Sequence, residues 1–104
     1  MMTLDVSLIG SFALIAVGLF CLATNRNMIM MVIGVEIMMN GSILALVGLA
    51  TNSATGLVDP LPQSLAIMAI AIGGSVAAVG LVMITQVYRH YKTLDVRELK
   101  KLRL

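Results

Sequence analysis

The chain has 104 residues, of which 60% are hydrophobic and 12% are charged, with a formal net charge of +2 and a mean hydropathy of +1.03. Soluble domains of this size are not so apolar, so the composition indicates a membrane protein. The length leaves room for one domain over residues 1–104 and excludes a separate soluble catalytic core. We therefore expect an all-α membrane protein with three transmembrane helices and a short amphipathic C-terminal tail.

The first predicted span covers about residues 4–23. Gly10 and Gly18 give it small surfaces at which another helix can approach closely. Cys21 is the single cysteine of the chain, which excludes an internal disulfide and a cysteine-based metal site. The N-terminus carries Asp5 and no lysine or arginine, so a cleaved signal peptide is not expected. We therefore expect this segment to remain in the mature protein.

A short polar turn at residues 24–27 joins the first span to the second. Because the turn is so short, the two spans must run antiparallel. Asn27 is expected to cap the second helix by accepting a hydrogen bond from its exposed backbone amides. Arg26 is expected to reach the membrane interface, where its charge remains hydrated.

The second predicted span, about residues 28–49, carries a glutamate well inside the membrane. A helix needs about 20 apolar residues to cross roughly 30 Å of hydrocarbon, and Glu36 lies about 12 Å of helical rise from the start of this one. A charge at that depth costs about 3 kcal/mol, so the side chain should face protein or trapped water. Asn40 follows one turn later on the same face, within hydrogen-bonding reach. We predict that Glu36 and Asn40 handle a proton or cation; the alternative is a protonated structural carboxyl bonded to a neighbouring helix.

Gly34, Gly41 and Gly48 recur every seven residues and form a narrow, smooth stripe on the second span. Because successive helical residues turn by about 100°, Glu36 lies roughly opposite this stripe. We infer that the glycine face packs against a helix of this chain and that the opposite face meets something different. The methionines of this span are expected to be adaptable packing rather than metal ligands, since no histidine or cysteine clusters with them.

The second loop, residues 51–63, is rich in small polar residues, glycine and proline, and should be irregular. Asp59, followed by Pro60, is expected to cap the third helix. The third predicted span covers about residues 64–87, carries no charge, and holds Ser75, which should bond back to its own helix. We assign two pairs of small residues in this span to helix packing, Gly73 with Ala77 and Gly74 with Ala78.

All seven lysines and arginines lie in the first loop or in the tail, residues 89–104. With three spans these two regions share one side of the membrane, and the positive-inside rule places that side in the cytoplasm and the N-terminus outside. Asp95 and Glu98 indicate the start of a short amphipathic helix, with Leu99 and Leu102 on one side. A basic tail this short, beside a membrane, does not favour nucleic-acid binding.

The segment TNRNMIMMVIGVEIMMN, residues 24–40, resembles the second helix of the small three-span subunit of complex I, the NuoK type. In that family an Arg-Asn turn precedes the pattern Ile-Gly-x-Glu-Ile-Met-x-Asn. The resemblance implies that Glu36 takes the place of a glutamate in a chain of buried polar groups used for ion translocation. The segment VDPLPQ, residues 58–63, looks instead like the MrpC-type subunit of Mrp-type cation/proton antiporters and the matching subunits of membrane-bound hydrogenases. The ending YKTLDVREL is similar to the tails of that wider family.

One position departs from the complex I pattern. In complex I the small subunit has a second glutamate in its third span, at a place that, counted back from Gly80 and Gln86, holds Val76 in this sequence. The resemblance then favours the branch that contains antiporters, energy-converting hydrogenases and sulfur-reducing complexes. Because a typical MrpC-type subunit often lacks the second-helix glutamate, the combination favours the hydrogenase-like and sulfane reductase-like respiratory complexes.

The resulting hypothesis is a non-catalytic membrane subunit of a multi-subunit respiratory complex that moves Na⁺ or H⁺, in an Mrp antiporter-like module of a hydrogenase or sulfane reductase. The implied partners are other membrane subunits, including large antiporter-like ones, and the lipid of the cell membrane; no cofactor or metal is expected in this chain. The alternatives are the MrpC-type subunit of a stand-alone Mrp Na⁺/H⁺ antiporter, a NuoK-like subunit of a quinone oxidoreductase, and a purely structural or assembly subunit. A small multidrug-type transporter is disfavoured, since such proteins have four spans and aromatic-lined sites, whereas this chain has no tryptophan, two tyrosines and two phenylalanines.

Overall fold

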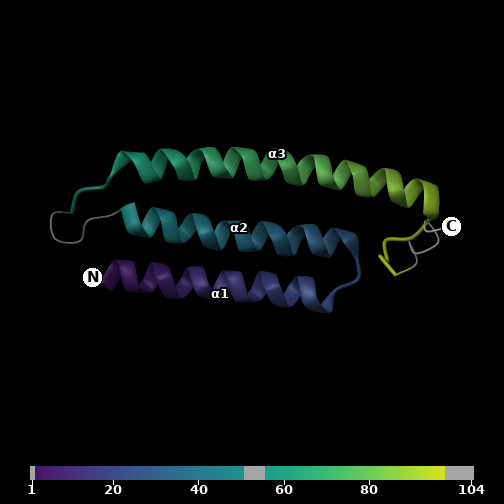
Figure 1. The fold of residues 1–104 in the computed structure, drawn as a ribbon, viewed down its shortest axis with the longest axis horizontal. Helices are drawn as coiled ribbons and strands as arrows, with labels where there is room; N and C mark the ends of the chain where they lie inside the picture. Colours follow the sequence, from purple (N-terminus) through teal and green to yellow (C-terminus); the bar gives the residue numbers. More distant parts are fainter. Residues whose placement is uncertain (1, 51–55, 98–104) are drawn as a thin grey trace.

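The computed structural model describes residues 2–50 and 56–97, which form three long helices (Figure 1). These are α1 (Met2–Thr24), α2 (Met28–Ala50) and α3 (Pro60–Tyr91). All three are long and apolar enough to cross a membrane, which confirms the predicted all-α, three-span architecture. The first two helices match their predicted bounds to within two residues, whereas α3 continues for four residues beyond its predicted span at each end.

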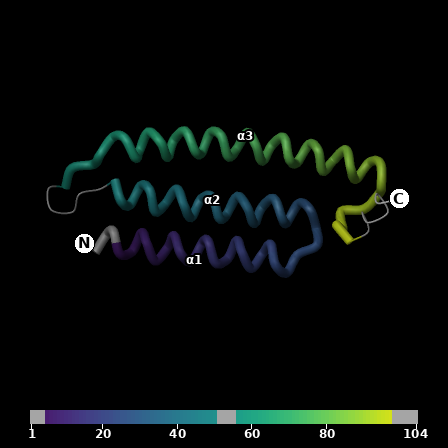
Figure 2. The backbone as a smooth tube through the Cα atoms, viewed as in Figure 1, coloured from purple at the N-terminus to yellow at the C-terminus, as the bar shows by residue number. Residues whose placement is uncertain are grey.

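The helices run antiparallel and lie side by side in a single layer, with α2 in the middle (Figures 1 and 2). The molecule measures 60 × 24 × 17 Å, so the layer is thin and α2 packs against both neighbours. The broad faces of the layer carry large apolar side chains that are mostly exposed, such as Phe12 and Ile67, each 68% exposed. These faces must be covered by lipid or by other protein, because water is a poor solvent for so much apolar surface.

Side-chain caps begin two of the helices as predicted. The Asn27 side-chain oxygen accepts a hydrogen bond from the Ile29 amide at 2.9 Å, at the start of α2. The Asp59 carboxylate accepts one from the Leu61 amide at 3.0 Å, and Pro60 follows in the first turn of α3. Each cap satisfies a backbone amide that has no partner within its helix, and so fixes where the helix starts.

The chain after α3 folds back onto the turn between α1 and α2. Lys92 ends α3 in the left-handed conformation, with φ 59°, and its amide donates to the Tyr88 carbonyl at 2.7 Å. Residues 94–96 then run antiparallel to residues 26–28, with a bridge between Asn27 and Asp95. We call this pairing the clasp. Its two backbone hydrogen bonds, both 3.1 Å long, run from the Met28 amide to the Leu94 carbonyl and from the Val96 amide to the Arg26 carbonyl.

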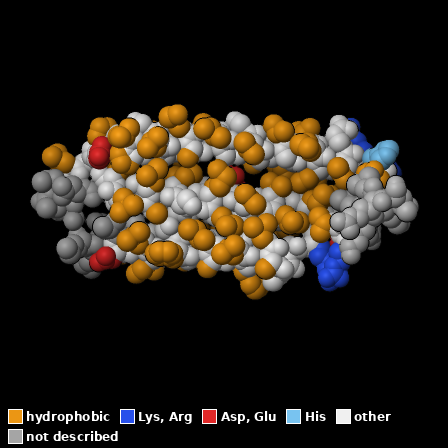
Figure 3. Space-filling view, viewed as in Figure 1, with side chains coloured by type: hydrophobic (Ala, Val, Ile, Leu, Met, Phe, Trp, Pro, Cys, Tyr) orange, Lys and Arg blue, Asp and Glu red, His pale blue; other side chains and the backbone are white. Residues whose placement is uncertain are grey.

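The clasp brings the first loop and the start of the tail to the same end of the molecule, where lysine and arginine side chains gather (Figure 3). The predicted tail helix, with Glu98, Leu99 and Leu102, lies outside the described residues. At the opposite end of the layer the Asp59 amide donates to the Ala50 carbonyl at 2.7 Å. Backbone hydrogen bonds therefore tie α2 to the segments flanking α3 at both ends.

Candidate functional site

The glycine stripe of α2 lies directly against α1. Gly34, Gly41 and Gly48 are all buried. A Cβ atom added at Gly34 would lie 3.1 Å from the Gly18 carbonyl oxygen, and one added at Gly41 would lie 2.9 Å from the Ser11 carbonyl oxygen. The two backbones thus approach too closely for most side chains. This contact fixes the rotation of α2 and turns Glu36 away from α1.

Two polar side chains of α1 strengthen the same contact. The Ser11 hydroxyl is buried and donates to the Gly41 carbonyl at 2.6 Å. The Cys21 thiol donates to the Met30 carbonyl at 3.2 Å, a weaker bond because sulfur is a weak donor. Sequence reasoning assigned no role to Ser11. Ser11 and Gly18 are seven residues apart, the same spacing as the α2 glycines. This shared spacing could have indicated that Ser11 lies on the face of α1 that packs against them.

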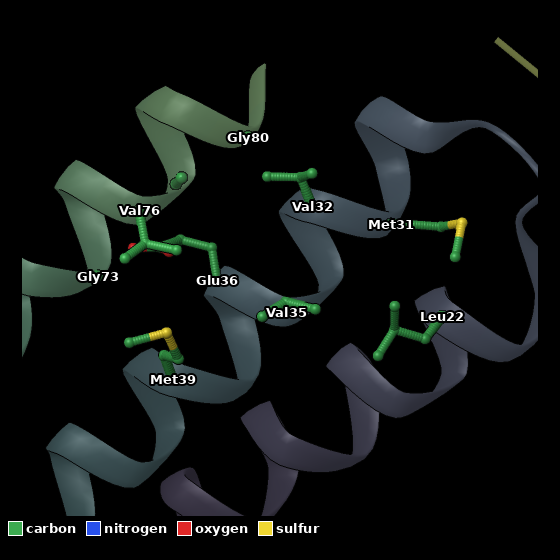
Figure 4. A pocket seen from close by; sticks show the side chains of 10 residues that line it. Leu22, Met31, Val32, Val35, Glu36, Met39, Gly73, Val76 and Gly80 are labelled. Atoms are coloured by element: carbon green, nitrogen blue, oxygen red, sulfur yellow. The ribbon is translucent and has the colours of Figure 1, made fainter. Parts of the chain in front are cut away.

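On its other side α2 borders a cavity of about 270 Å³ between α2 and α3. Figure 3 shows a hollow between these helices on this broad face, with an acidic side chain inside it. Glu36 is the one ionisable residue of the lining. The other lining residues are Leu22 of α1, Met31, Val32, Val35 and Met39 of α2, and Gly73, Val76, Ala77 and Gly80 of α3 (Figure 4).

The Glu36 side chain extends from α2 toward α3, where it ends beside Val76 and Gly73 (Figure 4). One carboxylate oxygen lies 3.7 Å from the position that a Cβ atom would take at Gly73. Glu36 is half-buried, and within the described residues it has no hydrogen bond or ion pair. The carboxylate therefore faces a space lined by methyl groups and backbone, with no partner from the described part of its own chain.

The wall of α3 opposite Glu36 is made of small residues. Gly73, Ala77 and Gly80 recur at helical spacing along this wall, and Gly73 is buried against Met39. The second predicted pair of small residues is placed differently. Gly74 and Ala78 are exposed, and nothing lies within 4 Å of a Cβ atom built at Gly74. Gly73 and Ala77 thus face α2, whereas the other pair faces away from it.

Asn40 does not join Glu36 in the cavity. Its side chain is exposed, it is absent from the cavity lining, and no hydrogen bond links it to Glu36 among the described residues. Residues four apart on a helix are offset by about 40° around the axis, and Glu36 leans toward α3. Ser75 bonds back to its own helix as predicted, donating to the Ala71 carbonyl at 2.8 Å. Of the two residues predicted to handle a proton or cation, only Glu36 therefore lines this cavity.

Val76 lines the same cavity as Glu36. By the resemblance drawn from the sequence, this is the position of the second glutamate in the small subunit of complex I. On that resemblance, the chain has a valine where complex I has a carboxyl group, in the same lining as Glu36 (Figure 4).

The ionisable groups that line this cavity amount to a single carboxylate. The described residues contain no group of three or more histidine, cysteine, aspartate or glutamate side chains that could hold a metal. One carboxylate can accept a proton or pair with one cationic group, whereas a hard cation such as Ca²⁺ takes six or more oxygen ligands.

A family model and several individual proteins match almost the whole length of the chain. A family model described as NADH-ubiquinone/plastoquinone oxidoreductase chain 4L matches residues 6–104. The NADH-quinone oxidoreductase subunit K of Buchnera aphidicola subsp. Baizongia pistaciae is 35% identical over 104 residues, covering 98% of both chains. The subunit K of Shewanella woodyi is 36% identical, covering 92% of both chains, and that of Thermus thermophilus is 36% identical, covering 92% of this chain and 96% of its own.

A solved structure is also similar in fold. One chain of the membrane-bound sulfane sulfur reductase, an archaeal respiratory membrane complex, superposes with a TM-score of 0.78 at 30% sequence identity. The match covers 88% of this chain and 94% of that one. The residues matched by the family model, 6–104, include every residue of the cavity lining.

Proposed function

The chain belongs to the NADH-ubiquinone/plastoquinone oxidoreductase chain 4L family, and from this premise we propose that Glu36 is one station for protons or cations in the ion path of a larger complex. The protein is a NuoK-like, multi-pass membrane subunit of a respiratory complex. Its partners are other membrane subunits, because its relatives are subunits of multi-subunit membrane complexes. Electron transfer takes place in those other subunits, and this chain is non-catalytic.

The observation that carries the proposal is the direction of Glu36. α2 uses its glycine face to pack against α1, and it turns the carboxylate into an open cavity on the other face. A carboxylate inside a membrane span is costly and normally serves transport or pairs with another group. A single station cannot carry a charge across the bilayer, so neighbouring subunits complete the path.

The complex is of the sulfane reductase or membrane-bound hydrogenase type, with an Mrp antiporter-like module that moves Na⁺ or H⁺. Two observations favour this assignment. The chain superposes on a subunit of a sulfane sulfur reductase, and Val76 stands where the resemblance to complex I calls for a second glutamate. Large antiporter-like subunits are then the neighbours. A subunit K of an NADH-quinone oxidoreductase is the second candidate, favoured by the 35–36% identity to such subunits.

In the membrane, the end that carries the clasp faces the cytoplasm and the N-terminus faces outward. The gathering of Arg26, Arg89, Lys92 and Arg97 at one end of the layer supports this orientation through the positive-inside rule.

The test is Glu36→Gln in the assembled complex. Glutamine keeps the shape of the side chain and can accept a hydrogen bond, so the complex should assemble in normal amount. Glutamine cannot carry a proton, so ion translocation per electron pair should fall by about tenfold or more. Ion uptake into inverted membrane vesicles measures this, with redox turnover recorded in parallel. Asp5→Asn is the matched control, since this exposed acid lies at the far end of α1.

The rival function is a purely structural subunit, in which Glu36 only bonds a partner helix. In that case Glu36→Gln would leave transport unchanged, and Glu36→Leu would cause loss of the subunit from the membrane. Normal ion translocation by a fully assembled Glu36→Gln complex would overturn the proposal.

A further inference from the structure

We propose that the cavity between α2 and α3 is the socket for a lysine side chain from a transmembrane helix of a neighbouring subunit, with its ammonium group on the Glu36 carboxylate. The inference deepens the proposed function by naming the partner of the same site, and it rests on that function in requiring Glu36 to work inside an assembled complex.

The described part of this chain provides no counter-charge for Glu36. Its arginines and its lysine lie at the clasp end, and Arg26 precedes α2, whose first residue is already about 12 Å of helical rise from Glu36. The opposite wall of the cavity consists of Gly73, Val76, Ala77 and Gly80. The Ser75 hydroxyl is already bonded to the Ala71 carbonyl. Since none of the described residues provides a partner for the carboxylate, we look for that partner in a neighbouring subunit.

The cavity is shaped and lined for an aliphatic chain with one polar end. Its volume of about 270 Å³ is several times the roughly 30 Å³ that one water occupies in the liquid. Ordered waters need two to four polar partners each, and this lining has a single polar side chain. Met31 and Met39 can adapt their shape around an inserted stem. An occupant that is apolar along its length and polar at its tip fills such a space best.

Lysine fits this description better than arginine does. An arginine guanidinium has five N–H donors, and the two oxygens of Glu36 cannot satisfy them all. A lysine ammonium has three donors, and its four-carbon stem packs against apolar side chains. The hollow is visible on a broad face of the layer (Figure 3), so a helix lying on that face can insert a side chain between α2 and α3.

The pair also accounts for how a single carboxylate can take part in ion movement. When the ammonium N–H bond breaks and an O–H bond forms on Glu36, an ion pair becomes a neutral carboxylic acid and a neutral amine. The total charge in the cavity stays at zero throughout the transfer. A buried lysine can exist in either protonation state, unlike arginine. The pair can therefore pass a proton without leaving an isolated charge inside the membrane.

The first experiment treats the intact complex, in its own membranes, with dicyclohexylcarbodiimide. The reagent activates the Glu36 carboxyl, a lysine amine within reach attacks it to form an amide, and the reagent leaves as dicyclohexylurea. We expect mass spectrometry to find a peptide containing Glu36 joined to a membrane-embedded lysine of one neighbouring subunit. The cross-link should be absent in Glu36→Gln. Recovery of Glu36 only as the unbranched acylurea adduct would overturn the proposal.

The second experiment is a charge swap. It tests the pairing of Glu36 with a lysine even if the reagent leaves Glu36 unmodified. Glu36→Lys puts two ammonium groups together and should lower the amount of assembled complex by about tenfold or more. The reciprocal lysine-to-glutamate change in the neighbouring subunit should restore assembly to within about twofold of the wild type. Failure of rescue at every lysine within the predicted spans of the contacting subunits would overturn the inference. Asp5→Lys serves as the control that needs no rescue.

The two proposals fail in different ways. If Glu36→Gln abolishes ion movement but neither experiment finds a lysine, the proposed function stands and the lysine partner is wrong. If the lysine is found and Glu36→Gln moves ions normally, the pair is structural and the proposed function is wrong.

Discussion

α2 packs closely against α1 and loosely against α3. Against α1, the backbones meet through glycines, and the Ser11 hydroxyl bonds across the contact at 2.6 Å. Against α3, backbone hydrogen bonds tie the flanking segments at both ends, and the middle holds a cavity of about 270 Å³. One face of α2 is used for close packing and the opposite face holds the carboxylate. The two faces of one helix therefore separate close backbone packing from an open cavity that contains an ionisable group.

The two interfaces of α2 are also expected to contribute differently to the association of the helices. Lipid provides no hydrophobic force between helices, so their association depends on van der Waals contact and interhelical hydrogen bonds. The α1–α2 contact has both. Atoms that line the α2–α3 cavity lack contact partners on one side and so lose dispersion energy there. We expect α1 and α2 to form the stable unit, with α3 held mainly by its ends and by neighbouring subunits.

The largest expected effect comes from adding one methyl group to the close contact. In Gly18→Ala the new Cβ atom would clash with Met38 and lie 2.7 Å from the Gly34 carbonyl oxygen, which cannot move away as a side chain can. Overpacking of this kind costs about 1–3 kcal/mol. Thermal unfolding in detergent should show a lower midpoint, and the subunit should be less abundant in membranes.

Gly80→Ala is the matched control, because nothing lies within 4 Å of a Cβ atom at that position. Its stability should equal or slightly exceed the wild type, since alanine favours a helix over glycine by up to about 1 kcal/mol. Equal losses in the two variants would mean that the two interfaces do not differ as described.

A middle-sized effect is expected from Ser11→Ala. This change removes the buried hydroxyl that donates to the Gly41 carbonyl. Interhelical hydrogen bonds in membranes average about 0.6 kcal/mol and reach about 1.7 kcal/mol. Ser75→Ala is the comparison, because its hydroxyl bonds only within α3. In the same unfolding assay Ser11→Ala should lose more stability than Ser75→Ala; the reverse order would contradict the role assigned to the α1–α2 contact.

The smallest expected effect concerns the clasp. Val96→Pro removes the amide that donates to the Arg26 carbonyl, since proline has no N–H. The loss of about 1 kcal/mol should loosen the tail with little change in overall stability. Trypsin should then cut after Lys92 or Arg97 several times faster in native membranes. Val96→Ala keeps the amide and should be cut at the wild-type rate; unchanged cleavage of Val96→Pro would show that the clasp does not hold the tail.

Much of the fold follows from local patterns in the sequence. Long apolar segments predict the three helices, and Asn27 and Asp59 predict two of the helix starts because a cap depends only on neighbouring residues. The seven-residue glycine period predicts a smooth face on α2. These features are set within a few turns of chain, which is the range over which sequence reasoning works best.

The features that were not predicted depend on segments far apart in the chain. The clasp joins residues 26–28 to residues 94–96 through backbone groups that leave no side-chain signature. The cavity depends on the spacing between α2 and α3. Asn40 was placed with Glu36 by helical spacing, but the carboxylate leans toward α3 and Asn40 stays outside the cavity lining. Spacing on a helix identifies which residues share a face and does not fix the direction of a side chain.

The thinness of the layer has a consequence for what surrounds α2. A layer of helices 17 Å thick buries few apolar side chains among its described residues, since a single helix with its side chains is already about 10–12 Å across. Residues of α2 therefore lie within about one helix width of the lipid or protein that covers each broad face of the layer. We therefore expect lipid or neighbouring subunits to complete the packing around α2 on both broad faces of the layer.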